Sequence, residues 1–121
     1  MGDRISPEQF HAVPGTADWR TTATGASARF RTGSFTAGVE LVDAIGELAD
    51  AADHHPDVDL RYAEVTVRLT SHDVGGLSER DAALARSIST AARELDVPAD
   101  DARPDPGADT GTGTGDGGGW E

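Results

Sequence analysis

Apolar and polar residues alternate along two short stretches in the middle of the chain. The apolar positions are even in the first stretch and odd in the second: Val58, Leu60 and Tyr62, then Val65, Val67 and Leu69. A period of two predicts β-strands, and the change of phase predicts a two-residue turn at Ala63-Glu64. This turn pairs Tyr62 with Val65 and places all six side chains, Tyr62 included, on the face of the hairpin that meets the core.

A longer stretch before this hairpin has helical spacing. Ser34 or Thr36 can cap a helix that runs to about Ala52, and Pro56 prevents any continuation. The stripe predicted to be buried consists of Val39, Leu41, Val42, Ile45, Leu48, Ala49 and Ala52. A second stripe is acidic and is predicted to face solvent: Glu40, Asp43, Glu47 and Asp50.

A second helix is predicted after the break at Gly75-Gly76. Ser78 and Asp81 have the spacing of a capping box, and Pro98 is expected to end the helix. The face predicted to be buried carries Leu84, Ile88, Ala91 and Leu95.

The first third of the chain has a weaker pattern. Residues 1–18 are predicted to be poorly ordered, with at most a short helix over Ser6–Ala12 that Ser6 caps and Pro7 begins. Residues 19–32 predict a hairpin with strands at Trp19–Thr24 and Ala28–Thr32 and a turn near Gly25.

The predicted order of elements is therefore β-β-α-β-β-α. Two hairpins, each followed by a helix, favour an α+β fold in two layers, with a four-stranded antiparallel sheet and both helices packed on one face. We expect this domain to span residues 19–97. Residues 98–121 are rich in Gly, Asp and Thr, carry Trp120 as their one large apolar side chain, and are predicted to be a disordered acidic tail.

The net charge of the chain limits the classes of molecule that it is expected to bind. Ten basic against 22 acidic residues give a net charge of −12, which argues against a nucleic-acid backbone as ligand. All ten basic residues are arginine, so the surface is acidic and free of lysine. We interpret this as the surface of a halophilic protein, since salt screens self-repulsion; the alternative is an ordinary acidic protein from a GC-rich genome. A fold indifferent to salt up to molar KCl would contradict the halophile hypothesis.

The expected cellular compartment of the protein is inferred from features that the sequence lacks. The chain contains no cysteine, which excludes disulfides, thiolate nucleophiles and cysteine-based metal sites. Neither an apolar run of about 20 residues nor a secretory signal pattern is present, and we expect a cytoplasmic protein.

Three of the four histidines lie between Asp50 and Asp81, at His54, His55 and His72. A histidine side chain, with an unperturbed pKa of about 6.5, can act as acid or base near neutrality. Adjacent residues in an extended chain point opposite ways, so His54 and His55 are predicted to play different parts.

His72 lies in phase with the outward positions of its strand, at a strand end where a cleft is plausible. Purely structural roles also fit these histidines, and a zinc site built from them and a carboxylate is a further alternative. Asp50 is equally explained as a surface acid, Asp81 as a helix cap and Tyr62 as a core residue.

The spacing of these residues resembles the pterin-4a-carbinolamine dehydratases, also called 4a-hydroxytetrahydrobiopterin dehydratases. The shared pattern is Asp50, three residues, His54-His55-Pro56, five residues, Tyr62, nine residues, His72, eight residues and Asp81. The runs Thr70-Ser71-His72-Asp73 and Gly75-Gly76-Leu77-Ser78 are also similar to the family, and the similarity covers about Trp19 to Ala92.

The resemblance implies dehydration of a 4a-hydroxytetrahydropterin to the quinonoid dihydropterin, in pterin recycling after an aromatic amino-acid hydroxylase. It implies His54, His55 and His72 as catalytic residues, with Asp50 and Asp81 in support, but does not say which histidine is acid and which is base. Loss of water requires neither a metal nor a redox cofactor. A homodimer or homotetramer is implied as well.

Two departures from the family bear on affinity. Val58 stands where the family often has an aromatic residue, and the N-terminal helix of longer members is abbreviated here. A different class of function, a non-enzymatic interaction or assembly module with the same fold, remains the alternative.

Overall fold

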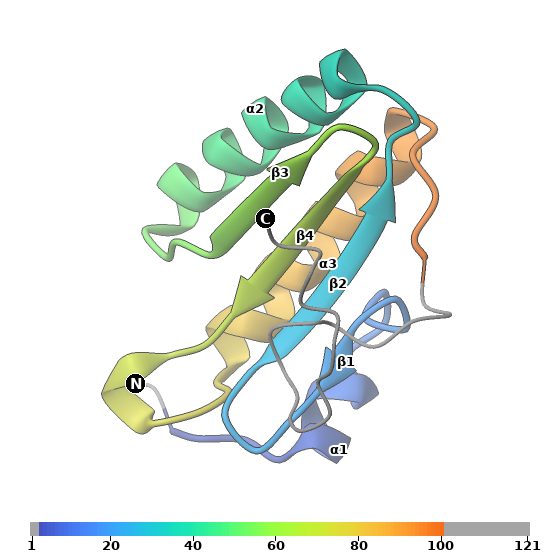
Figure 1. Cartoon of the computed structure of the whole chain (residues 1–121). Helices are drawn as coiled ribbons and strands as arrows, with labels where there is room; N and C mark the ends of the chain where they lie inside the picture. Colours follow the sequence, from blue (N-terminus) through green and yellow to red (C-terminus); the bar gives the residue numbers. More distant parts are fainter. Residues whose placement is uncertain (1–2, 101–121) are drawn as a thin grey trace, which may run out of the picture.

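The computed structural model of the chain describes residues 3–100, and the predicted disorder of the tail concerns residues that lie almost entirely outside this range. Within it, four antiparallel strands form one sheet in the order β1-β2-β4-β3, and Figure 1 shows the helices α2 and α3 together behind it. The predicted two-layer α+β fold is confirmed. The elements are α1 (Pro7–Ala12), β1 (Arg20–Thr21), β2 (Ala26–Arg31), α2 (Phe35–Ala52), β3 (Asp57–Arg61), β4 (Glu64–Leu69), the 3-10 helix η1 (His72–Val74) and α3 (Glu79–Glu94).

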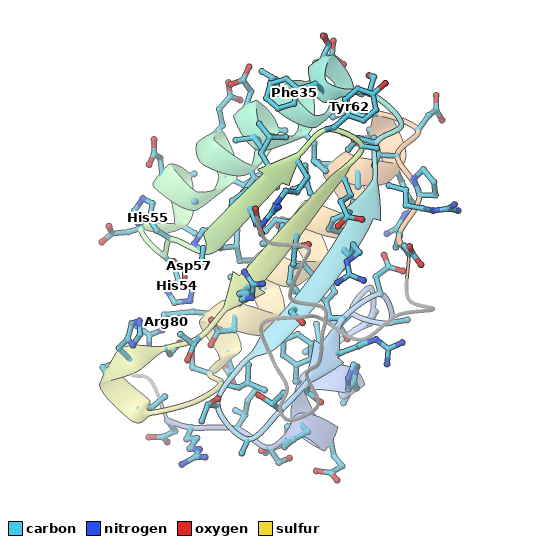
Figure 2. All side chains as sticks on the ribbon, in the orientation of Figure 1. Phe35, His54, His55, Asp57, Tyr62 and Arg80 are labelled. Carbon is cyan, nitrogen blue, oxygen red and sulfur yellow. The ribbon has the colours of Figure 1, made fainter. Side chains whose placement is uncertain are left out.

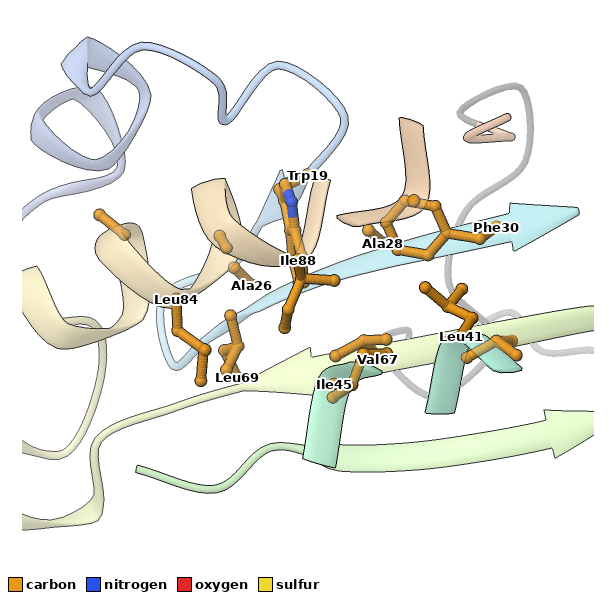
Figure 3. Close-up of a cluster of buried hydrophobic side chains, with 14 of the residues drawn as sticks. Trp19, Ala26, Ala28, Phe30, Leu41, Ile45, Val67, Leu69, Leu84 and Ile88 are labelled. Atoms are coloured by element: carbon orange, nitrogen blue, oxygen red, sulfur yellow. The ribbon is translucent and has the colours of Figure 1, made fainter. Parts of the chain in front are cut away.

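The core lies between the sheet and the two helices (Figure 3). Every second residue of β2 and β4 faces it, and α2 and α3 supply the opposite side. Trp19 closes one end, where its indole N–H donates to Ser89 Oγ at 2.9 Å and its ring meets the Phe30 ring edge to face. The fully buried large side chains include Trp19, Phe30, Leu41, Ile45, Val65, Val67, Leu69 and Ile88.

The turn of the central hairpin differs from the prediction by one position. Arg61 pairs with Glu64 and Leu60 with Val65, so the two-residue turn is Tyr62-Ala63 and not Ala63-Glu64. Tyr62 therefore lies in the turn, where its side chain is 73% exposed, and the assignment of Tyr62 to the core was wrong. Both registers place the same alternate residues on the inner face, so the apolar pattern alone could not separate them.

The buried faces of the two helices also differ in part from the predicted stripes. Ser34 caps α2 as one of the two predicted candidates, but Val39 and Ala52 are exposed. Gly38 is buried instead, because Leu60 packs so closely that a Cβ on Gly38 would lie 2.6 Å from its Cδ1. A glycine adds nothing to an apolar pattern, and the shift of the buried face was therefore missed.

The end of α3 was also predicted too late. Helix α3 ends at Glu94, and Asp96 then adopts a left-handed conformation with φ of 59°, so Pro98 lies beyond the helix. Leu95 is exposed as a result, while Leu84 and Ile88 are buried as predicted and Ala92 completes that face.

The N-terminal third is more closely attached to the domain than expected. Helix α1 has the predicted Ser6 cap, and Phe10 on it is fully buried in the core. The Ile5 N–H donates to Leu77 O at 2.9 Å, which ties this segment to the residues before α3. The hairpin of β1 and β2 is present, but β1 is shorter than predicted and β2 begins two residues earlier, at Ala26. The domain boundary at residue 19 stays a prediction.

Candidate active site

Three junctions between elements meet at one end of the sheet: the link from α2 to β3, the link from β4 through η1, and the start of α3. Figure 2 shows His54, His55, Asp57 and Arg80 gathered there, while Phe35 and Tyr62 lie at the opposite end of the sheet. Tyr62 therefore stands apart from the histidines, although it belongs to the shared spacing pattern.

The end of helix α2 determines the position of His54. Asp53 adopts the left-handed conformation, with φ of 53° and ψ of 42°, and its N–H bonds back to the last turn of α2. The His54 N–H donates to Ala49 O at 3.1 Å, which completes this helix end. Since Asp tolerates this conformation better than most residues, the chain can turn sharply here and enter β3 just after Pro56.

The two adjacent histidines turn to different carboxylates. His54 Nε2 lies 2.6 Å from Asp81 Oδ1 at the start of α3, whereas His55 Nε2 lies 3.0 Å from Asp50 Oδ1 on α2. The opposite orientations agree with the expectation for neighbours in an extended chain. Both predicted carboxylates thus lie beside predicted histidines.

Asp81 is the fully buried centre of a small hydrogen-bond network. Its Oδ2 accepts from Ser71 Oγ–H at 2.7 Å and from the Ser78 backbone N–H at 2.9 Å, while Oδ1 faces His54. Ser71 has one hydroxyl hydrogen, which goes to Asp81, so the Ser78 hydroxyl donates across the 2.7 Å contact between the two serines. Donors therefore surround this buried carboxylate, and the N-terminus of α3 adds a favourable dipole.

This network determines which nitrogen of His54 is available. An ionised Asp81 only accepts hydrogen bonds, so His54 Nε2 carries the hydrogen that it donates. In the neutral ring the lone pair then resides on Nδ1. The contact with Asp81 therefore uses Nε2 of His54 and leaves Nδ1 as its other ring nitrogen.

His72 is connected to the hydrogen-bond network of Asp81 through the preceding residue, Ser71. It begins η1 directly after Ser71, the residue whose hydroxyl donates to Asp81. Two backbone hydrogen bonds between Ser71 and Gly76 close the loop that carries His72. The backbone packs closely at Gly76, where a Cβ would lie 2.8 Å from Nε of the exposed Arg4 and 3.2 Å from Ala23 O.

A groove of about 440 Å³, which His72 helps to line, lies on the face of the sheet opposite the helices. Its polar lining includes Thr22, Thr24, Ser27, Asp57, Arg68 and His72. This volume lies within the range of about 300–1,000 Å³ that is usual for small-molecule sites. A larger groove of about 780 Å³ is lined by Asp3, Asp73, Glu79 and Arg80 among others, but by none of the histidines.

The sequence analysis did not assign Ser71, Asp73 or Arg80 to the site. Arg80 binds Asp73 through its Nη2, at 2.7 and 2.9 Å from the two carboxylate oxygens. The hydrogen bond from Arg80 lowers the pKa of Asp73 below its usual value, and the nearby charge of His54 lowers it slightly further. Ser71 and Asp73 lie inside the run Thr70-Ser71-His72-Asp73, and Arg80 directly precedes Asp81, so these positions were the available signal.

Two absences are observed within residues 3–100. No three side chains of His, Asp or Glu converge there as a metal site would require. Nor does any helix in that range combine the length and the apolar character needed to cross a bilayer.

Fold and site together define a class: a small α+β domain with a histidine–carboxylate site at one end of its sheet. The profile of the family described as "Pterin 4 alpha carbinolamine dehydratase" matches residues 3–91. The chain belongs to this family of dehydratases, as its resemblance indicated.

Relatives and solved structures agree with this placement. A "Putative pterin-4-alpha-carbinolamine dehydratase" of Nocardia farcinica is 41% identical over 90 residues, which cover 74% of this chain and 95% of that protein. One of the same name from Chloroflexus aurantiacus is 45% identical over 71 residues, 59% of this chain and 76% of the relative. The crystal structure of a "transcriptional coactivator/pterin dehydratase" from Brucella melitensis has a similar fold, with a TM-score of 0.66 at 22% identity over 73% of this chain and 97% of that one.

Proposed function

We propose that the chain dehydrates a 4a-hydroxytetrahydropterin to the quinonoid dihydropterin, with His54, His55 and His72 as its proton-transfer and substrate-positioning groups. The observation that carries this proposal is the buried pair of His54 and Asp81. Asp81 also accepts a hydrogen bond from Ser71, the residue directly before His72, which lines the groove. Membership in the dehydratase family supplies the substrate class.

The reaction requires two proton transfers. The bond between C4a and its hydroxyl oxygen breaks, and a general acid gives that oxygen a proton so that it leaves as water. A general base removes the proton from N5, and its electron pair forms the double bond between C4a and N5. Histidines suit both steps near neutral pH, and a positioned acid or base contributes about 10²–10⁴-fold to the rate.

The surroundings of each histidine suggest separate parts. His54 is held by Asp81 and can exchange a proton at Nδ1 without losing its orientation. His72 lines the groove that would hold the pterin ring, and the exposed His55 contacts Asp50 on α2. In pterin recycling, the substrate would come from a hydroxylase that uses the tetrahydropterin.

The test is the rate of dehydration of a 4a-hydroxytetrahydropterin, measured in high-salt buffer for the parent chain, His54→Ala and His72→Ala. His11→Ala is the matched control, since His11 is exposed on α1, away from the junctions that form the site. We expect each site variant to lose about 10²–10⁴-fold and the control to lose nothing.

The same assay addresses the non-enzymatic alternative. An interaction module would leave all four chains at the uncatalysed rate. Equal rates for the parent and both site variants would therefore reject the enzymatic proposal.

A further inference from the structure

The start of the described chain lies against the loop between β4 and α3. Figure 1 shows residues 3–6 (dark blue) beside this loop (yellow) on the way to α1. The Ile5 N–H donates to Leu77 O at 2.9 Å, and Arg4 pairs with Ser78 as an isolated antiparallel bridge. Since the Ser78 side chain caps α3, the segment is attached to the start of the helix that carries the buried carboxylate of the site.

Helix α1 fixes the position of this segment. Ser6 caps α1, and the Gln9 side chain completes a capping box with it. Phe10 on the same helix is fully buried in the core. The exposed side chain of Arg4 therefore begins from a backbone that is anchored on both sides, at Ser78 and in α1.

The guanidinium of Arg4 joins two loops, which we call the β1–β2 turn (residues 22–25) and the His72 loop (residues 71–76). Arg4 Nη2 donates to Ala23 O in the β1–β2 turn at 3.0 Å. In the His72 loop, a Cβ on Gly76 would lie 2.8 Å from Arg4 Nε, and 3.2 Å from both Arg4 Cζ and Ala23 O. Arginine suits this place, because its long side chain ends in a planar group with several donors.

The β1–β2 turn and the His72 loop both line the groove of about 440 Å³. The residues that they contribute are Thr22, Thr24, Gly25, His72 and Gly75. Within residues 3–100, the lining of the groove does not include Arg4. The Arg4 side chain therefore acts on the two loops and not on a ligand between them.

Hydrogen bonds of its own close each loop. In the β1–β2 turn, the Thr22 N–H donates to Gly25 O at 2.8 Å, and the Gly25 N–H donates to Thr22 Oγ1 at 3.2 Å. In the His72 loop, the Ser71 N–H donates to Gly76 O at 2.7 Å and the Gly76 N–H to Ser71 O at 3.3 Å. A contact of Arg4 with both loops therefore fixes the position of one closed loop relative to the other.

Thr70 provides a second link between the loops. Its hydroxyl donates to Thr24 O at 2.6 Å and lies 3.4 Å from Gly76 O. Thr70 also lines the groove, so its substitution would change the surface that a ligand meets. Arg4 is the link that can be removed while this surface keeps its side chains.

We propose that Arg4 is a positioning residue of the active site, which holds the β1–β2 turn against the His72 loop and keeps the groove in the shape that receives the substrate. The effect on the substrate rests on the proposed function, whereas the contact between the loops does not. Without Arg4 the loops adopt the binding arrangement for only a fraction of the time, and the apparent affinity falls by that fraction. Bound substrate restores the arrangement, so the chemical step stays the same.

Steady-state kinetics of Arg4→Ala tests the positioning role. We expect KM for a 4a-hydroxytetrahydropterin to rise about three- to tenfold and kcat to stay close to that of the parent. A variant that is merely less stable contains less folded chain, which lowers the apparent kcat and leaves KM unchanged. An unchanged KM, with or without a fall in kcat, would overturn the proposal.

Arg31→Ala is the matched control. Arg31 is exposed at the end of β2 and pairs with Glu64, next to the Tyr62-Ala63 turn and away from the groove. Its substitution removes the same charge from the chain, and we expect the KM of the parent. An equal rise in KM for both variants would assign the effect to net charge and would overturn the proposal.

Gly76→Ala displaces the Arg4 side chain without removing it. The new methyl group would lie 2.8 Å from Arg4 Nε, so the exposed guanidinium has to move away. We expect KM to rise nearly as much as in Arg4→Ala, with little further rise in the double variant. Fold-changes that multiply in the double variant would show that the two positions act independently, contrary to the proposal.

Amide hydrogen exchange followed by NMR tests the contact between the loops without substrate. The amides of Thr22, Ser71 and Gly76 close the two loops, and we expect them to exchange about three- to tenfold faster in Arg4→Ala. The amides of α2 should exchange as in the parent, and Arg31→Ala should change neither set. Unchanged exchange in the loops, or an equal increase in α2, would reject the role of Arg4 in holding the loops.

The kinetic and exchange measurements separate this proposal from the proposed function. If no chain accelerates dehydration, the parent included, the proposed function fails, while the exchange rates still decide whether Arg4 holds the two loops together. If the parent is active and Arg4→Ala has the same KM, the positioning role alone fails.

Discussion

His54 and His55 are neighbours in the chain, and each contacts one aspartate, yet their surroundings differ sharply. The side chains of His54 and Asp81 are 11% and 0% exposed, with 2.6 Å between Nε2 and Oδ1. Those of His55 and Asp50 are 59% and 81% exposed, at 3.0 Å. The same pair of side-chain types therefore occurs once inside the protein and once on its surface.

The difference shows what burial adds to a contact. On the surface, water and salt compete for both charges, and such pairs contribute about 0–1 kcal/mol. Inside, Asp81 depends on the donors of Ser71, Ser78 and His54, because a buried carboxylate without donors is strongly unfavourable. The buried pair therefore holds a ring in one orientation, while the exposed pair leaves its ring free to move.

The largest expected effect comes from breaking the buried pair. Asp81→Ala leaves two serine donors and the His54 ring without their acceptor, and we expect it to lower the free energy of unfolding by about 3–5 kcal/mol. Urea titration followed by circular dichroism measures this loss. Asp50→Ala is the control and should stay within about 0.5 kcal/mol of the parent. Similar losses in both variants would contradict the distinction between the pairs.

A conservative change separates positioning from stability. Asp81→Asn keeps the shape, but its amide cannot accept from all the present donors, so His54 loses its fixed tautomer. Under the proposed function we expect kcat to fall by up to about 10²–10⁴-fold, with little change in KM. Asp50→Asn should leave kcat nearly unchanged. A rise in KM with constant kcat for Asp81→Asn would show that Asp81 serves binding and not proton transfer.

The effect of salt should also distinguish the two histidine–aspartate pairs, although the free energies involved are smaller. A double-mutant cycle on His55 and Asp50 should give a coupling free energy of about 0.2–1 kcal/mol in dilute buffer and nearly none in 1 M KCl. The cycle on His54 and Asp81 should give a larger value that salt hardly changes, because water and ions do not reach Asp81. A salt-sensitive coupling at the buried pair would contradict this.

The smallest effect concerns the exposed pair of Asp73 and Arg80. Arg80 lowers the pKa of Asp73 from 3.8, so the pair stabilises the fold above that pH and its contribution is lost as pH falls through the lowered value. Arg80→Gln should therefore be less stable than the parent at pH 5 to 7, and the gap should close in strong acid. Urea midpoints across pH measure it; a gap independent of pH would remove the ion pair as the cause.

The predictable parts of the fold rest on contacts between residues close in sequence. The Ser6 cap and the capping box of Ser78 and Asp81 each join residues three positions apart, and both are present. The turn at Tyr62-Ala63 was predicted one residue too late. Val65 pairs with Leu60 and not with Tyr62, and both pairings leave every apolar residue on the same face of the hairpin. Packing of Leu60 against Gly38 of α2 adds information that the alternation lacks.

The sequence by itself determined the two-layer α+β fold, the family and three histidines worth testing, since periodicity, caps and motif spacing are local properties of the chain. Only the tertiary structure decided which carboxylate each histidine meets. His55 and Asp50 are five positions apart at one helix end, whereas 27 positions separate His54 from Asp81. Folding of the sheet between α2 and α3 brings that second pair together, and it buries the carboxylate that sets the two histidines apart.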